Sequence, residues 1–393
     1  MNVWIANPFD NLPQEGFRPQ RYWLVAEAFA ARGDSVVVFS STFSHALKKP
    51  RVPLSGSWKA PGGGNAPELV LVPSPSYPRN VCLRRLYAHW RFARNWLRVA
   101  RRMPPPDVVV VSSPPLTLVA AARKFCAECG AKLVVDVQDA WPETFLRVAP
   151  RFALLPLFAM ARRNYRAADA ISAVAERYLE LAASYGARAP RHLARLAARM
   201  EAAPSAAAPS APPPLALAYV GNMSLSYDLA TLVDAVARFD GVTLDLAGAG
   251  PDEAALRARA AGCGRIRFHG YLPEAELRAM LAKCHAGVVP MFEDSCVGVP
   301  GKLSDYLAAA LPVLNTLPGE TSDLLARASA GVTCAAGDAS SYVAAFSKLA
   351  AGIEGFRAGA IALRGEFDAA SVYSRYADWI AAMAAKGGGA TSE

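Results

Sequence analysis

Glycines, a lysine and an aspartate lie close together in residues 298–305, where the sequence predicts the start of a helix. Backbone N–H groups at a helix N-terminus bind anions, so those of Val299 and Gly301 are candidates for holding a pyrophosphate. Lys302 adds a positive charge. Asp305, one helical turn later, could hold two hydroxyl groups of a ribose. This combination predicts a nucleotide-diphosphate site.

Three further strand-like runs end in glycines, in the segments YVGN (219–222), LAGAGP (246–251) and FHGYLP (268–273). A glycine after a strand lets the backbone approach a phosphate or a sugar closely. One such turn is weak evidence, but four glycine-bearing junctions in order favour a binding site. The residues that we expect to bind the nucleotide and any sugar attached to it are Gly221, Asn222, Gly248, Gly250, Tyr271, Leu272, Val299, Pro300, Gly301, Lys302 and Asp305.

The loop 8–22 follows the first predicted strand and carries polar side chains. Glu15, Gly16 and Arg18 in this loop are candidates for contacts with a sugar or a diphosphate.

Two carboxylates, Asp139 and Glu143, follow another predicted strand of the N-terminal half. Either could act as a general base that accepts the proton of a hydroxyl group, with Asp139 preferred. Lys302 is the third predicted catalytic residue, because cations and helix N-terminal amides stabilise a leaving diphosphate.

Apolar, β-branched runs alternate with helical patterns along the chain, as in 35–41, 107–113 and 215–221. Continuous apolar strands separated by helices indicate parallel sheets covered on both faces. Ligands of such sheets bind beyond the carboxyl ends of the strands. We therefore expect an α/β fold of two doubly wound, Rossmann-like domains that face a cleft.

The small, Pro-rich segment 201–214 predicts an interdomain linker. It separates an N-terminal domain, 1–200, from a second domain, 215–365, which contains the predicted nucleotide site. We expect the last segment, 366–393, to form a helix that crosses back to the N-terminal domain.

Charge is distributed unevenly along the 393 residues, whose net charge is +9. Residues 1–200 hold 28 Lys and Arg against 13 Asp and Glu, whereas residues 201–393 hold 14 against 20. The basic half suggests an anionic partner. The scattered, odd number of cysteines and the lack of a signal-peptide pattern or of an apolar run of about 18 residues favour a cytoplasmic protein.

The segment 83–102 predicts a helix that is both basic and aromatic. Its arginines alternate with apolar residues that include Leu86, Trp90, Phe92 and Trp96. A solvated helix face is one interpretation, and a helix lying on an anionic membrane is the other. Nucleic acid could use the same charges, but no nucleic-acid-binding module is present and we expect no such partner.

Five segments of the second half, YVGN, LAGAGP, FHGYLP, AGVVP and DYLAAALPV, resemble the donor-domain motifs of one enzyme family. With VVDVQDAWPET in the first half, they make nearly the whole chain similar to GT-B-fold retaining glycosyltransferases of family 4 (group 1). Within that family the resemblance is to enzymes of bacterial surface-polysaccharide and lipopolysaccharide synthesis. The family's paired acidic residues fall on Val297 and Asp305, and its usual histidine before Asp139 is Gln138.

The resemblance implies transfer of a sugar, with retained configuration, from a nucleotide-diphospho-sugar, most simply UDP-linked. It implies that the predicted nucleotide site binds this donor and that the N-terminal half, with Glu15, Gly16 and Arg18, binds a lipid-linked or lipopolysaccharide acceptor. It also implies no metal cofactor. Together with the basic helix at 83–102, it predicts a peripheral position on the inner face of the bacterial cytoplasmic membrane. Two alternatives stay open. One is a nucleotide-sugar 2-epimerase on the same fold, and the other is a catalytically degenerate, membrane-associated subunit that binds sugar nucleotides.

Overall fold

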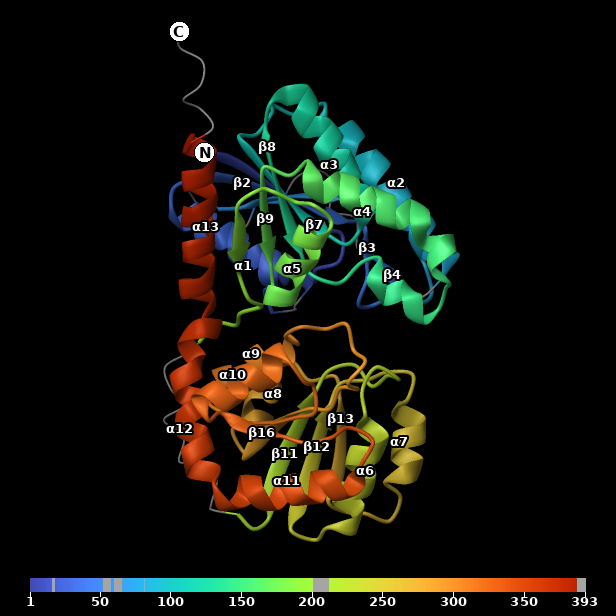
Figure 1. Cartoon of the computed structure of the whole chain (residues 1–393), viewed down its shortest axis with the longest axis vertical. Coiled ribbons are helices and arrows are strands. Elements are labelled where there is room, and N and C mark those ends of the chain that lie inside the picture. The colour runs from blue at the N-terminus through green and yellow to red at the C-terminus, as the bar shows by residue number, and fades with distance from the viewer. Residues whose placement is uncertain (16–17, 52–57, 60–65, 81, 201–211, 387–393) are drawn as a thin grey trace. The chain divides into compact units, whose positions relative to one another are not determined.

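The computed structural model describes residues 1–393 except 16–17, 52–57, 60–65, 81, 201–211 and 387–393. The chain divides into two compact units (Figure 1). The N-terminal unit comprises Met1–Arg195 and Val372–Glu393, and the second unit is Leu196–Ser371. Each unit contains a parallel sheet with helices packed against it, which confirms the predicted α/β class with two Rossmann-like domains. Most of the predicted linker lies outside the described residues.

The sheet of the N-terminal unit has the strand order β10-β9-β8-β7-β1-β2-β6-β5. Its neighbouring strands are parallel, except for the pair β5 and β6. Central strands such as β7 are buried along their whole length, as expected for a sheet covered on both faces. The strands are β1 (Asn2–Ala6), β2 (Ser35–Ser41), β5 (Trp58–Lys59), β6 (Glu68–Val72), β7 (Val108–Ser113), β8 (Lys132–Val137), β9 (Ala170–Ala173) and β10 (Arg191–Leu193), and the separate antiparallel pair is β3 (Phe43–Ser44) with β4 (Lys49–Pro50).

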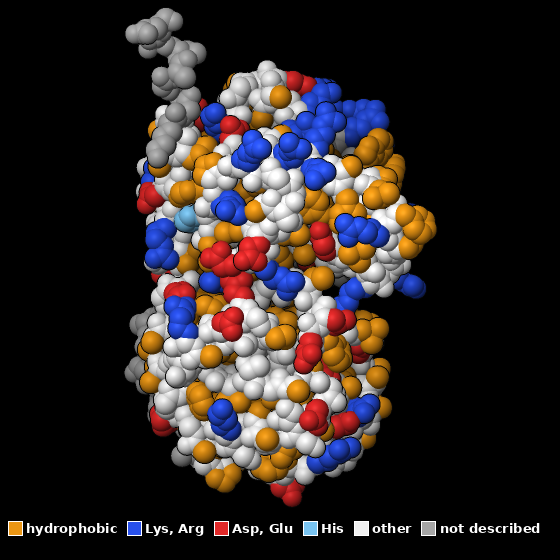
Figure 2. Space-filling view, viewed as in Figure 1, with side chains coloured by type: hydrophobic (Ala, Val, Ile, Leu, Met, Phe, Trp, Pro, Cys, Tyr) orange, Lys and Arg blue, Asp and Glu red, His pale blue; other side chains and the backbone are white. Residues whose placement is uncertain are grey.

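Helices of the N-terminal unit carry much of its positive charge. Figure 2 shows Lys and Arg side chains gathered at the upper right of this unit, where Figure 1 places α2 and α3. None of the helices in the described part of the chain is long and apolar enough to cross a membrane. The helices are α1 (Arg21–Ala31), α2 (Leu83–Ala100), α3 (Leu116–Cys129), α4 (Leu155–Arg166), α5 (Glu176–Ser184) and α13 (Ala369–Lys386), with 3-10 turns η1 (Pro13–Glu15), η2 (Glu143–Arg147) and η3 (Arg151–Leu154).

A buried ion pair joins the first helix of the N-terminal unit to the centre of its sheet. Arg21 donates from Nε and Nη2 to the two carboxylate oxygens of Asp136, each at 2.9 Å. Ser172 also donates to Asp136, at 2.6 Å, and its hydroxyl lies 2.6 Å from that of Tyr376 on α13. One carboxylate therefore ties α1, two strands and the C-terminal helix together.

The sheet of the second unit has the strand order β13-β12-β11-β14-β15-β16, and its neighbouring strands are parallel. The chain order reverses between β11 and β14, so the crevice where ligands of such folds bind lies at that point. The strands are β11 (Leu215–Val220), β12 (Val242–Ala247), β13 (Ile266–Gly270), β14 (Ala286–Val289), β15 (Val313–Asn315) and β16 (Gly331–Thr333). The helices are α6 (Leu229–Arg238), α7 (Glu253–Arg259), α8 (Glu274–Leu281), α9 (Lys302–Ala308), α10 (Glu320–Ala328), α11 (Ala339–Ala351) and α12 (Ile353–Leu363), followed by the 3-10 turn η4 (Arg364–Phe367).

Tyr306 of α9 holds β11 and β14 where their ladder ends. The two strands pair only through Leu217–Ala286 and Ala218–Gly287. Beyond that point the Tyr306 hydroxyl accepts from the N–H of Val220 and donates to the carbonyl of Val288, both at 3.0 Å. A Cβ at Gly287 would lie 2.2 Å from the Tyr306 ring, so this close approach requires the glycine.

We expect Asp136→Ala to lower the free energy of unfolding of the N-terminal unit by about 3–5 kcal/mol, because Arg21 would keep a buried charge without its partner. Urea unfolding followed by tryptophan fluorescence reports on this unit alone, since all seven tryptophans lie in it. The control is Glu128→Ala, which breaks the exposed ion pair with Arg101 and should change stability little. Equal losses in the two variants would contradict the role assigned to Asp136.

Candidate active site

The ammonium group of Lys302 lies at the first residue of α9, over the rings of Tyr219 and Tyr227. Its Nζ is 4.0 Å and 3.7 Å from the two ring centroids, and the residue is only 8% exposed. Within the part of the chain that the structure describes, no acceptor lies within hydrogen-bond distance of this Nζ. Burial lowers the pKa of Lys302 well below its usual value, and the charge of Asp305 opposes this only in part. The position therefore favours an anionic ligand.

The glycines after β11 and β12 let two loops of the protein pack on each other. A Cβ at Gly248 would lie 1.9 Å from the carbonyl oxygen of Gly221, and one at Gly250 would lie 2.1 Å from that of Met223. Gly221 and Gly248 also have φ values of +136° and +134°, which favour glycine. The sequence correctly predicted that the backbone is closely approached at these glycines. In the structure that approach is between loops, and contact with a ligand stays a prediction.

Gly221 is the glycine nearest the buried cation. A Cβ at this position would lie 3.4 Å from Nζ of Lys302. The neighbouring Asn222 is held by its carbonyl, which accepts from the Tyr219 hydroxyl at 2.6 Å. These two predicted donor residues therefore lie beside Lys302.

The other predicted donor residues differ in exposure. Val299, Pro300 and Asp305 are buried, and Gly301 is half-buried. Gly298, which precedes this set, is fixed by its carbonyl, which accepts from the Thr321 hydroxyl at 2.9 Å. Tyr271 is 65% exposed and Leu272 half-buried, at the end of β13.

Asp139, the preferred base, follows β8 in the N-terminal unit. Its Oδ1 accepts from the N–H of Ala140 at 2.8 Å and from the Thr144 hydroxyl at 3.4 Å. Burial raises the pKa of Asp139, while these hydrogen bonds and the charge of Arg85 act in the other direction. A carboxylate with a raised pKa is a stronger proton acceptor, which suits a general base.

Close to Asp139 lies an aromatic and basic cluster that the sequence did not predict as a unit. The guanidinium of Arg85 lies over the rings of Phe9 and Trp141, 5.5 Å and 5.4 Å from their centroids. The ring of His89 contacts both of these aromatic rings. Burial lowers the pKa of His89 to about 3, so its imidazole is neutral near pH 7. The cluster joins the loop after β1, helix α2 and the loop after β8.

The predicted acceptor residues of loop 8–22 are only partly described, since Gly16 lies outside the described residues. The carboxylate of Glu15 is occupied by two hydrogen bonds within the protein. It accepts from the N–H of Leu12 in the same loop and from Nε of Arg51, both at 3.0 Å. Arg18 is exposed. The visible role of Glu15 is to hold the loop, and contact with an acceptor stays a prediction.

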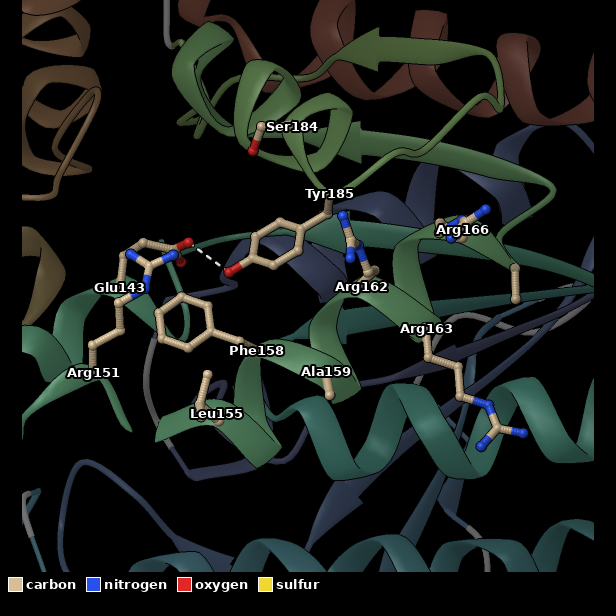
Figure 3. Close-up of a pocket in the computed structure, with 11 residues that line it drawn as sticks. Glu143, Arg151, Leu155, Phe158, Ala159, Arg162, Arg163, Arg166, Ser184 and Tyr185 are labelled. Atoms are coloured by element: carbon tan, nitrogen blue, oxygen red, sulfur yellow. Dashed lines mark hydrogen bonds between the residues drawn. The ribbon is translucent and has the colours of Figure 1, made fainter. Parts of the chain in front are cut away.

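Glu143 projects into a pocket of about 780 Å³ that is lined by α4 and the end of α5. Its Oε1 accepts from the Tyr185 hydroxyl at 2.6 Å (Figure 3). Asp139 is not among the residues that line this pocket. The two predicted bases therefore have different surroundings, and the raised pKa favours Asp139. In the described chain, no group of three His, Cys, Asp or Glu side chains is placed to hold a metal ion.

Both units match models of known glycosyltransferase families. Residues 214–351 match "Glycosyl transferases group 1", and residues 19–197 match "Glycosyl transferase 4-like domain". The protein is a glycosyltransferase. No curated protein sequence is significantly similar to it.

Solved structures confirm the GT-B fold of this glycosyltransferase. A sucrose-phosphate synthase from Thermosynechococcus elongatus superposes with a TM-score of 0.77 at 13% identity, over 98% of this chain and 99% of that one. HepE from Anabaena, in complex with UDP and glucose, gives 0.67 at 13% identity over 97% and 100%. WaaG, involved in lipopolysaccharide biosynthesis, gives 0.64 at 16% identity over 96% and 99%.

The face of helix α2 that is exposed to solvent differs from the one that the sequence predicted. Phe92 and Trp96, expected in a membrane-facing set, are 1% and 0% exposed and pack in the core. Arg85 likewise turns inward, donating to the carbonyl of Asn80 at 2.7 Å. The exposed face instead consists of Leu83, Arg84, Leu86, Tyr87, Trp90, Arg94 and Arg98.

We expect Lys302→Met to stabilise the second unit by roughly 1–4 kcal/mol, because an apolar side chain removes the cost of burying an amine. The lowered pKa means that the unfolded state binds more protons between the folded pKa and about 10.5. Parent stability therefore rises with pH in that window, and the gain from Lys302→Met should shrink there. Hydrogen exchange of residues 215–363 measures the gain. Lys348→Met, at an exposed lysine of the same unit, is the control, and a similar gain there would rule out the burial argument.

Proposed function

We propose that this glycosyltransferase moves a sugar from a UDP-linked donor to a lipid-linked or lipopolysaccharide sugar, with retention of anomeric configuration. The observation that carries the donor half is the buried ammonium of Lys302, which has no hydrogen-bond acceptor in the described chain. A buried polar group without a partner costs free energy that a ligand can recover. The diphosphate of a sugar nucleotide supplies acceptor oxygens of the required charge.

The position of Lys302 supports the same assignment. It lies beside the loop after β11, next to the point where strand order reverses, and ligands of doubly wound sheets bind there. In this site Lys302 would neutralise charge that develops on the leaving diphosphate, in surroundings where water screens little. Asp305, buried one turn along α9, would hold the ribose hydroxyls. The complex of HepE with UDP and glucose supports a UDP-linked donor.

The acceptor half of the proposal rests on the N-terminal unit. Asp139 would take the proton of the attacking hydroxyl, and the half-buried ring of Phe9 would contact the acceptor sugar. WaaG, a structural neighbour of lipopolysaccharide biosynthesis, supports an acceptor of that class. The exposed face of α2 would hold the enzyme on the inner surface of the cytoplasmic membrane, where a lipid-linked acceptor is found. We further propose that transfer needs no metal ion, as in the family that the sequence resembles.

A thermal-shift screen against UDP-, GDP- and dTDP-sugars tests the donor. We expect a UDP-sugar at a hundred times its dissociation constant to add ~2.7 kcal/mol of stability. Lys302→Met should lose this shift, because the diphosphate would lose its charge partner. With the responding donor and a lipid-linked acceptor, transfer should continue in EDTA, and the NMR coupling of the product's anomeric proton should match that of the donor. A shift that Lys302→Met retains in full would exclude this site.

Vesicle sedimentation tests the corrected face of α2. We expect binding to anionic vesicles and not to neutral ones, weakened by salt because the attraction is screened. Replacing the three arginines of that face, Arg84, Arg94 and Arg98, with glutamine should release the protein, since each cation near an anionic surface contributes roughly 1 kcal/mol. Arg85 stays unchanged because its side chain points inward. If the variant sediments as well as the parent, α2 is a solvated face.

A further inference from the structure

The pocket that contains Glu143 combines three chemical properties. The first is positive charge. Arg162 and Arg166 of α4 extend to the side of the helix where Tyr185 lies, whereas Arg163 extends to the opposite side (Figure 3). Among the described residues that line the pocket, Glu143 is the only acid. The arginines therefore favour an anion, and their planar guanidinium groups suit phosphate.

The second property is a free acceptor atom. Oε1 of Glu143 is occupied by the Tyr185 hydroxyl at 2.6 Å (Figure 3). Its Oε2 is buried, and none of the described residues donates a hydrogen bond to it. A buried oxygen without a partner needs a donor such as a hydroxyl group. The phosphodiester of a lipid has no hydroxyl group of its own, so such a ligand should carry hydroxyl groups in its head group as well as negative charge.

The third property is an exposed apolar rim. Leu155 lines the pocket and is 56% exposed. Phe152 in the adjoining turn η3 is 74% exposed, and Val148 just before it is 65% exposed. Large apolar side chains that gather on a surface mark a site of interaction. An apolar chain attached to the bound head group could cover them.

We propose that this pocket binds a lipid phosphate with a hydroxylated head group. The phosphate pairs with Arg162 and Arg166, a head-group hydroxyl donates to Oε2 of Glu143, and the lipid chain lies over Leu155 and Phe152. Two sources share this chemistry: a membrane phosphatidylglycerol, and a phosphosugar attached to a lipid carrier. The site lies within the N-terminal unit and uses neither Lys302 nor the exposed face of α2.

Calorimetry with soluble short-chain probes tests the pocket. We expect dihexanoyl phosphatidylglycerol to bind at least tenfold more tightly than glycerol phosphate, which lacks the chain. The double variant Arg162→Gln/Arg166→Gln should weaken this binding at least tenfold. Arg188→Gln/Arg191→Gln, which removes two exposed arginines outside the pocket, should change it less than twofold. Thermal unfolding of each variant shows whether it is folded.

Further variants separate the contribution of the lipid chain from that of the Glu143 carboxylate. Leu155→Ser should weaken binding of the lipid but not of glycerol phosphate. Glu143→Gln, which replaces the free acceptor by an amide, should abolish the preference for phosphatidylglycerol over dihexanoyl phosphatidylcholine. A prenyl-linked phosphosugar that binds more tightly than phosphatidylglycerol would support the carrier as source, and the reverse order would support the membrane lipid.

Three results would overturn the proposal. Equal affinity for glycerol phosphate and the lipid would show a site for free phosphate. Equal losses in the two arginine pairs would show diffuse attraction. Loss of lipid binding in Lys302→Met, with none in Arg162→Gln/Arg166→Gln, would place the ligand in the donor site. Failure of the donor proposal alone would leave the two arginine-pair results unchanged.

Discussion

The hydroxyl group of Tyr306 replaces a ladder hydrogen bond at the point where β11 and β14 separate, and the position of Lys302, on which the proposed donor site rests, depends on that replacement. The bond from Val220 and the bond to Val288 fix the tyrosine, and the tyrosine fixes α9 against the sheet. Lys302 lies four residues before Tyr306, on the same face of the helix. Its ammonium is therefore held over β11 by a hydrogen-bonded ring. The hydrogen bonds of Tyr306 between β11 and β14 thus determine where the charge of Lys302 lies.

The burial of Lys302 lowers the stability of the second unit. An ammonium group buried over two aromatic rings gains cation–π attraction but loses hydration. Burial lowers the pKa of Lys302, and the charge of Asp305 opposes this only in part. A residue that only filled space would be apolar. Destabilising charge that persists in a fold is typical of binding sites, where the ligand supplies the missing partner. In the proposed donor site, the destabilising charge of Lys302 would be paired by the bound anion.

The sequence predicted the sheets well because buried parallel strands are continuous apolar runs, as in VVVVSS of β7. It also located glycines that permit a close approach, although Gly248 and Gly250 serve loop packing. One face of α2 carries Arg85, His89, Phe92 and Trp96, as their spacing indicates. Because Arg85 is charged, the sequence did not indicate that this face points inward. Its long side chain reaches a backbone carbonyl, which no local pattern reveals. The pairing of Glu143 with Tyr185 joins residues 42 positions apart, so only the fold could show it.

The cations of the two units differ in how they can select a ligand. Lys302 is buried and isolated, so a correctly placed diphosphate would be bound in preference to water, and selectivity follows from burial. The arginines of α4 are exposed and hydrated, so charge alone would attract many anions weakly. Selectivity at that pocket must come from what surrounds the charge, namely the free oxygen of Glu143 and the apolar rim at Leu155. A buried amine suits a soluble, highly charged donor, whereas exposed guanidinium groups beside apolar side chains suit a ligand that is itself partly apolar.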